Sequence, residues 1–260
     1  MAGPRIILFD LETLPDLSEA LRVWPSLSDY PGKTLRATIT SIICAGWKVF
    51  GEKKVNCINA WDFTEWERNV NDDKKLCIRI HEVLCEADAV ITHNGLRFDW
   101  KHLQTRFIKH GLDPLPKIPH IDTKALASKN LYTFNNKLGY LGEQFVDDRK
   151  LDHEGWDLWV KVHNRCKKSM DKMAKYCKQD VLLLEKIYRV LRPFSNHIPN
   201  HNIFSFNYAA GKPVCPKCGS TRLKNKGYRN TQTRSYKRYK CRDCGSYSRT
   251  DMKDKLPRSY

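Results

Sequence analysis

The stretch Ile7–Thr13, ILFDLET, decides how the chain begins to fold. Its apolar residues stand at consecutive positions, which predicts a strand that is apolar on both faces, as in the centre of a sheet covered by helices. The strand then runs into two carboxylates, Asp10 and Glu12. Residues two apart on a strand project from the same face, so these like charges repel each other unless a cation lies between them. A solvent-exposed strand end has the same composition and is the alternative for this pair alone.

The following residues alternate between strand-like and helix-like patterns. Strands are expected over ATITSIICAGWKVF, KKVNCINAW, AVITHNG and PHIDTKALA, with a turn at Gly51-Glu52 between the first two. Helices are expected over DDKKLCIRIHEVLCEAD, FDWKHLQTRFIKHGL and, after a long irregular stretch, MDKMAKYCKQDVLLLEKIYRVL. This order predicts an α/β fold, with a mixed sheet that begins as a three-stranded meander and is flanked by helices.

Length and composition suit one globular domain with a small additional module. The chain has 260 residues, of which 41% are hydrophobic, and this is enough for a packed core. It has no apolar run near the roughly 18 residues that a membrane span needs, and its start lacks the pattern of a signal peptide. We therefore expect a soluble protein without a membrane partner.

The ten cysteines fall into two groups by their spacing. Six are scattered singly: Cys44, Cys57, Cys77, Cys85, Cys166 and Cys177. Isolated cysteines of this kind usually act as small buried hydrophobic residues, whereas the other four are paired at short spacing. This division favours an intracellular, reducing compartment over a disulfide framework.

Positive charge is concentrated near the C-terminus. The chain carries a net charge of +17, and residues 211–260 contain 15 Lys/Arg against 3 Asp/Glu. Such a concentration indicates a polyanionic partner, with nucleic acid ahead of an anionic membrane surface. A tail that only increases solubility is the alternative.

The pattern divides the chain into four segments. Residues 1–194 form the predicted α/β domain, 195–211 a linker that lacks periodicity, 212–250 a small cysteine-containing module and 251–260 a basic tail. His197 and His201 in the linker are not expected to bind a metal ion together, because Pro199 between them prevents a helical i, i+4 arrangement.

Two further segments supply acidic side chains that could join Asp10 and Glu12. Asp99, in HNGLRFD, follows a strand-to-loop transition, where α/β sheets collect functional groups. Tyr176 and Asp180, in YCKQD, are one helical turn apart and share a face. Oxygen ligands of this kind favour Mg²⁺ or Mn²⁺. Tyr176 taken alone would equally suit an apolar helix face in the core.

FDLET, HNGLRFD and YCKQD, in this order, resemble the three exonuclease motifs of the DEDD superfamily. This ribonuclease H-like group includes the proofreading domains of DNA polymerases. Lys175 stands where one subgroup has a histidine, and Tyr176 takes the alternative place, so the likeness is to the tyrosine subgroup, DEDDy. Within it the chain is most similar to the exonuclease domains of family B DNA polymerases and their stand-alone relatives. The resemblance covers residues 5–192 and implies a ribonuclease H-like fold.

The resemblance implies a phosphodiester hydrolase that uses two Mg²⁺ or Mn²⁺ ions and releases nucleoside 5′-monophosphates from a 3′ end. Asp10 would bridge both ions, Glu12 and Asp180 would hold the ion that activates water, and Asp99 would serve the second ion. Tyr176 would orient the attacking water through its hydroxyl, because a phenol is mostly protonated at neutral pH. DNA is favoured over RNA by the likeness to proofreading domains, and an RNA-directed exonuclease is the alternative.

Residues beside the acids form a second set of candidates. The family grips the terminal nucleotide at positions that match Thr13, Leu14, Asn94 and Phe98. Each of these also suits core packing. Trp156 and Trp159 could stack on bases, but their spacing of three more often buries one side of a helix, and burial is our prediction.

The C-terminal module contains two CxxC pairs, Cys215 with Cys218 and Cys241 with Cys244. Four thiolates at this spacing form a closed tetrahedral shell for one structural Zn²⁺. The strands RLKNKGY and SYKRYK, around the turn RNTQT, would fill the spacer between the pairs. The module resembles the zinc ribbons of some transposase-associated proteins over residues 213–249.

Basic and aromatic residues alternate along this ribbon, which indicates contact with nucleic acid. The candidates for phosphate contacts are Arg229, Lys237 and Arg238. A ribbon that docks a protein partner is the alternative. For the whole chain, the rival prediction is a DNA-binding or recruitment protein whose nuclease-like domain is only structural, and the presence of all five motif residues argues against it.

Overall fold

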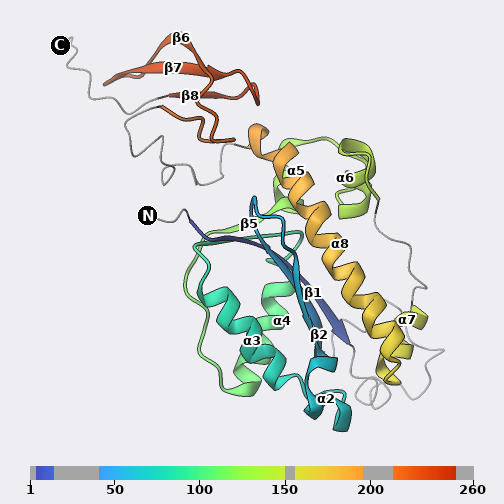
Figure 1. The fold of residues 1–260 in the computed structure, drawn as a ribbon. Coiled ribbons are helices and arrows are strands. Elements are labelled where there is room, and N and C mark those ends of the chain that lie inside the picture. The colour runs from blue at the N-terminus through green and yellow to red at the C-terminus, as the bar shows by residue number, and fades with distance from the viewer. Residues whose placement is uncertain (1–3, 15–40, 150–155, 196–212, 250–260) are drawn as a thin grey trace. The chain divides into compact units, whose positions relative to one another are not determined.

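The computed structural model describes residues 4–14, 41–149, 156–195 and 213–249 (Figure 1). In the N-terminal part a five-stranded mixed sheet has the strand order β3-β2-β1-β4-β5. Its strands are β1 (Ile6–Leu14), β2 (Ser41–Val49), β3 (Asn56–Asn59), β4 (Ala89–Thr92) and β5 (His120–Asp122). Since β1 pairs antiparallel with β2 and parallel with β4, the stretch ILFDLET lies in the middle of the sheet, as predicted.

Helices cover both faces of this sheet. Figure 1 shows α3 (Lys74–Cys85) and α4 (Asp99–His110) on one side and the long α8 (Lys167–Leu191) on the other. The residues between these layers are apolar and buried, among them Ile7, Phe9, Ile42, Leu76 and Leu103. The predicted α/β fold class, a mixed sheet flanked by helices, is confirmed. Among the described helices, none has the length and apolar character that crossing a membrane requires.

The segment from His120 to Asn130 differs from the predicted strand over PHIDTKALA. Only β5 is extended, and Thr123–Asn130 forms helix α5. The Asp122 side chain accepts hydrogen bonds from the backbone N–H groups of Lys124 and Ala125, which caps the helix directly after the strand. The stretch predicted to be irregular also contains α6 (Leu138–Phe145) and α7 (Trp156–His163), and η3 (Ala60–Asp62) and α2 (Thr64–Arg68) follow β3.

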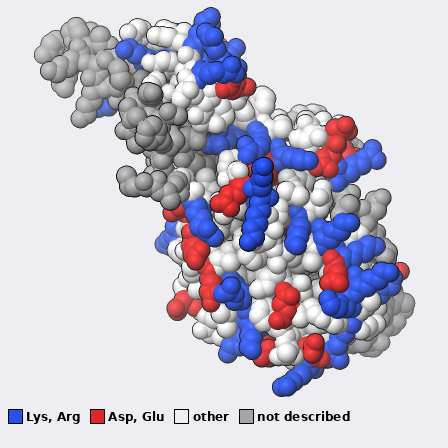
Figure 2. Space-filling model, viewed as in Figure 1, with Lys and Arg blue, Asp and Glu red and all other residues white. Residues whose placement is uncertain are grey.

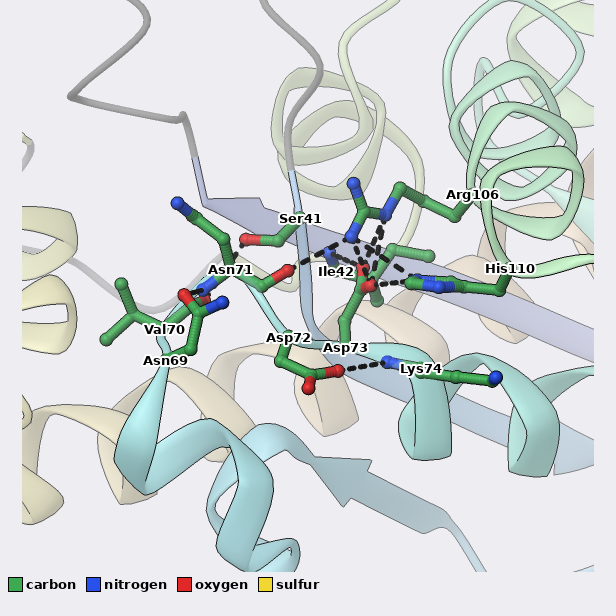
Figure 3. A network of polar contacts seen from close by, with 10 residues as sticks. All are labelled: Ser41, Ile42, Asn69, Val70, Asn71, Asp72, Asp73, Lys74, Arg106 and His110. Atoms are coloured by element: carbon green, nitrogen blue, oxygen red, sulfur yellow. Dashed lines mark hydrogen bonds and ion pairs between the residues drawn. The ribbon is translucent and has the colours of Figure 1, made fainter.

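A buried ion pair fastens α3 and α4 to the start of β2 (Figure 3). Asp73 precedes α3, and its carboxylate forms a salt bridge with the guanidinium of Arg106 on α4. The same carboxylate accepts a hydrogen bond from the backbone N–H of Ile42 at 2.7 Å and contacts Nε2 of His110 at 2.6 Å. Because the protein supplies all of these partners, the buried charge of Asp73 is compensated inside the core.

The C-terminal described residues form a separate three-stranded antiparallel sheet of β6 (Leu223–Asn230), β7 (Ser235–Cys241) and β8 (Tyr247–Arg249). β6 and β7 were predicted, and β8 was missed because it has only three residues. The described chain divides into two compact units: one is Arg5–Ile187, and Tyr188 onward, with Pro4, belongs to the other. The tail 251–260 and the linker with His197 and His201 lie outside the described residues, except for Ser195.

Candidate active site

Three carboxylates from two distant segments meet beside β1. One oxygen from each of Asp10, Glu12 and Asp180 can be chosen so that all three lie within 4.8 Å of one another. Asp10 and Glu12 come from the central strand, and Asp180, which is 7% exposed, comes from α8. Like charges this close repel each other, and a cation among them removes the repulsion. The structure thus brings together three of the four predicted acids.

Gly46 on β2 allows α8 to come this close to the sheet. It pairs with Asp10 in the β1–β2 ladder, so both residues lie on the sheet face that α8 covers. A methyl group at Gly46 would lie 2.9 Å from Sγ and 3.1 Å from the carbonyl oxygen of Cys177. Asp180 stands one turn after Cys177, so the absence of a side chain at Gly46 helps to position Asp180. This role was not predicted, although a glycine inside a strand often marks a close approach of backbone.

A β-bulge shifts the pairing register near the end of β1. The pairing shifts between Glu12, which stands opposite Cys44, and Thr13, which stands opposite Ile42. The indole Nε1 of Trp159 on α7 donates a hydrogen bond to the Thr13 carbonyl at 3.1 Å. Trp159 is half-buried against the core, in line with the predicted burial. The side chain of Trp156 lies outside the described part of the structure.

Asp99 is the first residue of α4, and its carboxyl group lies next to the backbone of β1. Burial raises the pKa of Asp99 to about 7, and the negative charge of Asp122 adds to this shift. A hydrogen bond from the backbone N–H of Leu11 acts in the opposite sense. Asp99 therefore contacts β1 at Leu11, which stands between Asp10 and Glu12. It is not part of the group of three acids whose oxygens lie within 4.8 Å of one another.

Asp122 organises the turn that leads from β4 to Asp99. Its carboxylate accepts the backbone N–H of Asn94 at 2.9 Å and that of Leu96 at 3.4 Å. Asn94 has a φ of 69°, a left-handed conformation that asparagine tolerates better than most residues. The sequence predicts Asp122 on a strand but does not predict its hydrogen bond with Asn94, because this bond joins residues that are far apart in the chain.

The other predicted side chains lie as follows. Leu14 is 1% exposed and belongs to the core, and Thr13 is half-buried. Phe98 is half-buried, and its ring lies edge-on to His102 with a centroid distance of 4.4 Å. Tyr176 is 8% exposed and stands one helical turn before Asp180.

The four C-terminal cysteines form a cluster of thiols. Their Sγ atoms all lie within 4.8 Å of one another, and Sγ of Cys215 is 3.6 Å from that of Cys244. Tetrahedral Zn²⁺ with Zn–S bonds of about 2.3 Å places its sulfurs about 3.8 Å apart, so the cluster fits this ion. The two CxxC turns are alike: the N–H of Gly219 bonds the carbonyl of Cys215, and that of Gly245 bonds the carbonyl of Cys241.

The paired residues of the C-terminal sheet place basic and tyrosine side chains together on one face, which we call the basic face. The strand pairing places these seven residues on it: Lys224, Arg229, Tyr236, Arg238, Lys240, Tyr247 and Arg249. The guanidinium of Arg249 lies 4.3 Å from the ring centroid of Tyr236. Lys237 points to the opposite face, so the three predicted phosphate contacts do not share one surface. In the view of Figure 2, most of the charged side chains visible on this sheet are Lys or Arg, whereas both signs mix on the larger unit.

Comparison with known proteins supports the ribonuclease H-like fold and finds a likeness to one DNA polymerase. A model of the RNase_H superfamily matches residues 35–192, more than half of the chain. DNA polymerase III PolC-type of Ureaplasma parvum serovar 3 is 24% identical over 168 residues, which make up 64% of this chain and 10% of that polymerase. The chain thus spans about a tenth of that relative. β1, with Asp10 and Glu12, precedes the range that the superfamily model matches.

Proposed function

Because the chain belongs to the RNase_H superfamily, we propose that it is a metal-dependent nuclease of the DEDDy type that shortens nucleic acid from the 3′ end. The meeting of Asp10, Glu12 and Asp180 within 4.8 Å carries this proposal. A strand and a distant helix contribute these acids, and three carboxylates on one spot would destabilise the fold without a function to retain them. The likeness to a DNA polymerase III makes DNA the preferred substrate.

The donor set fits Mg²⁺ or Mn²⁺. All three groups offer carboxylate oxygens, which hard divalent cations prefer, and neither histidine nor cysteine is among them. Asp10, Glu12 and Asp180 would hold one ion, and Asp99 would contribute to a second beside Asp10. When bound, two such ions activate a water molecule and neutralise the oxygen that leaves the phosphorus.

The protein's own residues fix the geometry of the reaction. Asp10 and Glu12 stand on the central strand β1 and pair with Gly46 and Cys44 of β2, so the sheet fixes their backbone on that side. Tyr176, one turn before Asp180, would hold the attacking water by a hydrogen bond from its hydroxyl. The water oxygen forms a bond to phosphorus and gives up a proton, and the bond from phosphorus to the 3′ oxygen of the preceding nucleotide breaks. This oxygen takes up a proton and becomes the new 3′ hydroxyl, and a nucleoside 5′-monophosphate is released.

The C-terminal sheet would hold the substrate. A zinc ion on Cys215, Cys218, Cys241 and Cys244 would stabilise the ribbon, which has a small core of its own. Arg and Lys of the basic face would neutralise phosphates, while Tyr236 and Tyr247 between them offer rings for stacking. The paired residues described on this face include no acidic side chain, which favours nucleic acid over a basic protein partner.

The test is digestion of a single-stranded DNA that carries a label at its 5′ end, in the presence of Mg²⁺ or Mn²⁺ or of a chelator. We expect a ladder that shortens from the 3′ end only when metal is present. A labelled mononucleotide as the first product would mean that digestion starts at the 5′ end, which contradicts the proposed direction. A single internal cut would indicate an endonuclease. An RNA of the same sequence, digested in parallel, measures the preference for DNA.

Asp180→Asn and Asp171→Asn form a matched pair of variants. Both remove one charge from α8, but Asp171 has a side chain that is 62% exposed and pairs only weakly with Lys167 at 3.6 Å. Loss of groups that merely support a metal ligand costs 10–100-fold, so Asp180→Asn should lower the rate by about 100-fold or more. Asp171→Asn should match the unaltered protein. If the unaltered protein binds DNA but leaves every end intact with both metals, the DNA-binding or recruitment role replaces the nuclease.

A further inference from the structure

Three cysteines that are far apart in the sequence meet on the sheet face that α8 covers. Cys44 on β2 and Cys57 on β3 have their Sγ atoms 3.2 Å apart. The pairing explains this contact: Gly46 stands opposite Cys57, so Cys44 and Cys57 are diagonal neighbours on one face. Cys177 on α8 is packed against Gly46 between them.

The three thiols differ in their access to solvent. Cys44 and Cys177 are fully buried, each at 0% exposure, whereas Cys57 is half-buried on β3, the edge strand of the sheet. A small oxidant would therefore reach Cys57 first. The neighbouring thiols of Cys177 and Cys44 hold the pKa of Cys57 below its ordinary value, and the positive charge of Lys178 acts in the same sense.

We propose that Cys57 and Cys44 form a peroxide-reactive thiol pair. The sulfur of Cys57 attacks one oxygen of hydrogen peroxide, the O–O bond breaks, and Cys57 becomes a sulfenic acid while one water is released. The sulfur of Cys44 then attacks the sulfur of Cys57, the S–O bond breaks, and a second water leaves as the disulfide forms. Peroxide is reduced to two waters, and two thiols are oxidised to one disulfide.

This pair lies beside the acidic site, on the same face of the sheet. Cys44 stands opposite Glu12 in the β1–β2 ladder, and the thiol of Cys177 donates a hydrogen bond to the Asp10 carbonyl at 3.6 Å. A disulfide requires the two sulfurs to move closer together than they are, and β3, an edge strand of 4 residues, has a neighbouring strand on one side only. The modification does not depend on the proposed nuclease function, because it follows from the thiols alone.

The experiment uses the full chain, loaded with zinc and treated with increasing hydrogen peroxide. Remaining thiols are then alkylated, and tryptic peptides are analysed by mass spectrometry without reduction. We expect a peptide in which Cys44 is linked to Cys57, at peroxide concentrations at least tenfold below those that oxidise Cys85. Cys85 is the matched control, because it is exposed and has no cysteine neighbour among the described residues.

Two variants keep the inference falsifiable even if one of them folds poorly. Cys44→Ser or Cys44→Ala should abolish the link and leave Cys57 as a sulfenic acid that dimedone traps, with a circular dichroism spectrum that matches the unaltered protein. A Cys57 that stays reduced while Cys85 is oxidised would overturn the proposal. A disulfide that joins Cys57 to any cysteine other than Cys44 would overturn it as well.

Discussion

Replacement of Gly46 by alanine tests whether the distance between α8 and the sheet sets the geometry of the acidic site. The new methyl group would lie 2.9 Å from Sγ of Cys177 and 3.2 Å from Cγ2 of Val181. Comfortable contacts lie at about 3.5–4.0 Å, so α8 or β2 must move by about 0.6 Å or more. Added methyl groups in a packed core cost about 1–3 kcal/mol.

This cost predicts two measurable effects. The free energy of unfolding should fall by about 1–3 kcal/mol, which lowers Tm by roughly 2–4 °C for each kcal/mol. The nuclease rate should fall further than this loss of stability explains, since a misplacement of about 1 Å costs up to about 100-fold in rate. Thermal unfolding and the DNA digestion assay measure the two effects on the same preparation.

Gly111→Ala separates the loss of activity from the loss of stability. Gly111 caps α4 with a φ of 68°, and a methyl group there would meet no atom within 4 Å. The substitution strains the backbone by about 1–2 kcal/mol but leaves α8 in place. We expect Gly111→Ala to be less stable yet fully active below its Tm. Equal rates for both variants under these conditions would refute the positioning role of Gly46.

The other predictions concern protonation, zinc and the basic face. Since the folded protein raises the pKa of Asp99 to about 7, binding of Mn²⁺ should weaken as pH falls below 7, and metal-free stability should decrease as pH rises from about 4 to 7. Asp122→Asn removes a negative charge beside Asp99 and should lower the pKa of Asp99. In calorimetric titrations with Mn²⁺, the pH at which binding has fallen to half should therefore be lower for this variant. Cys241→Ser should release zinc, measured by a chromogenic chelator, and make the dependence of DNA binding on salt shallower. Arg238→Ala on the basic face should weaken DNA binding more than Lys237→Ala on the opposite face, by electrophoretic mobility shift; equal losses would contradict the assignment of that face.

Patterns within a single element account for the parts of the fold that the sequence predicts. The apolar run before Asp10 predicts a central strand, and the repeating apolar positions of α8 predict a long helix. By contrast, α5 follows β5 without any spacer, because the side chain of Asp122 caps the helix at the last residue of the strand. A strand of 3 residues is too short for a period of two to be visible.

Contacts between elements account for what the sequence cannot predict. Asp122 holds the turn before Asp99, a role that its sequence neighbours do not indicate, and Gly46 leaves room for α8, where the glycine suggests a close approach but not the element that makes it. The same holds for the cysteines: Cys44 and Cys177 are buried singly in their own elements, as expected for small hydrophobic residues, while Cys85 is exposed. Their meeting depends on strand register and helix position, which only the folded chain defines.

One packing requirement connects the acidic site with the thiol pair. For Asp180 to reach Asp10 and Glu12, α8 must lie close to β1 and β2, and the residues beneath it must be small. Gly46 meets this requirement by having no side chain, and the short side chain of Cys44, opposite Glu12, leaves room as well. Cysteine is small and apolar enough for this position, but it also brings a reactive sulfur beside the site. A serine of similar volume would place a hydroxyl in a buried apolar layer, so the thiol is the less costly choice and its reactivity follows from the packing.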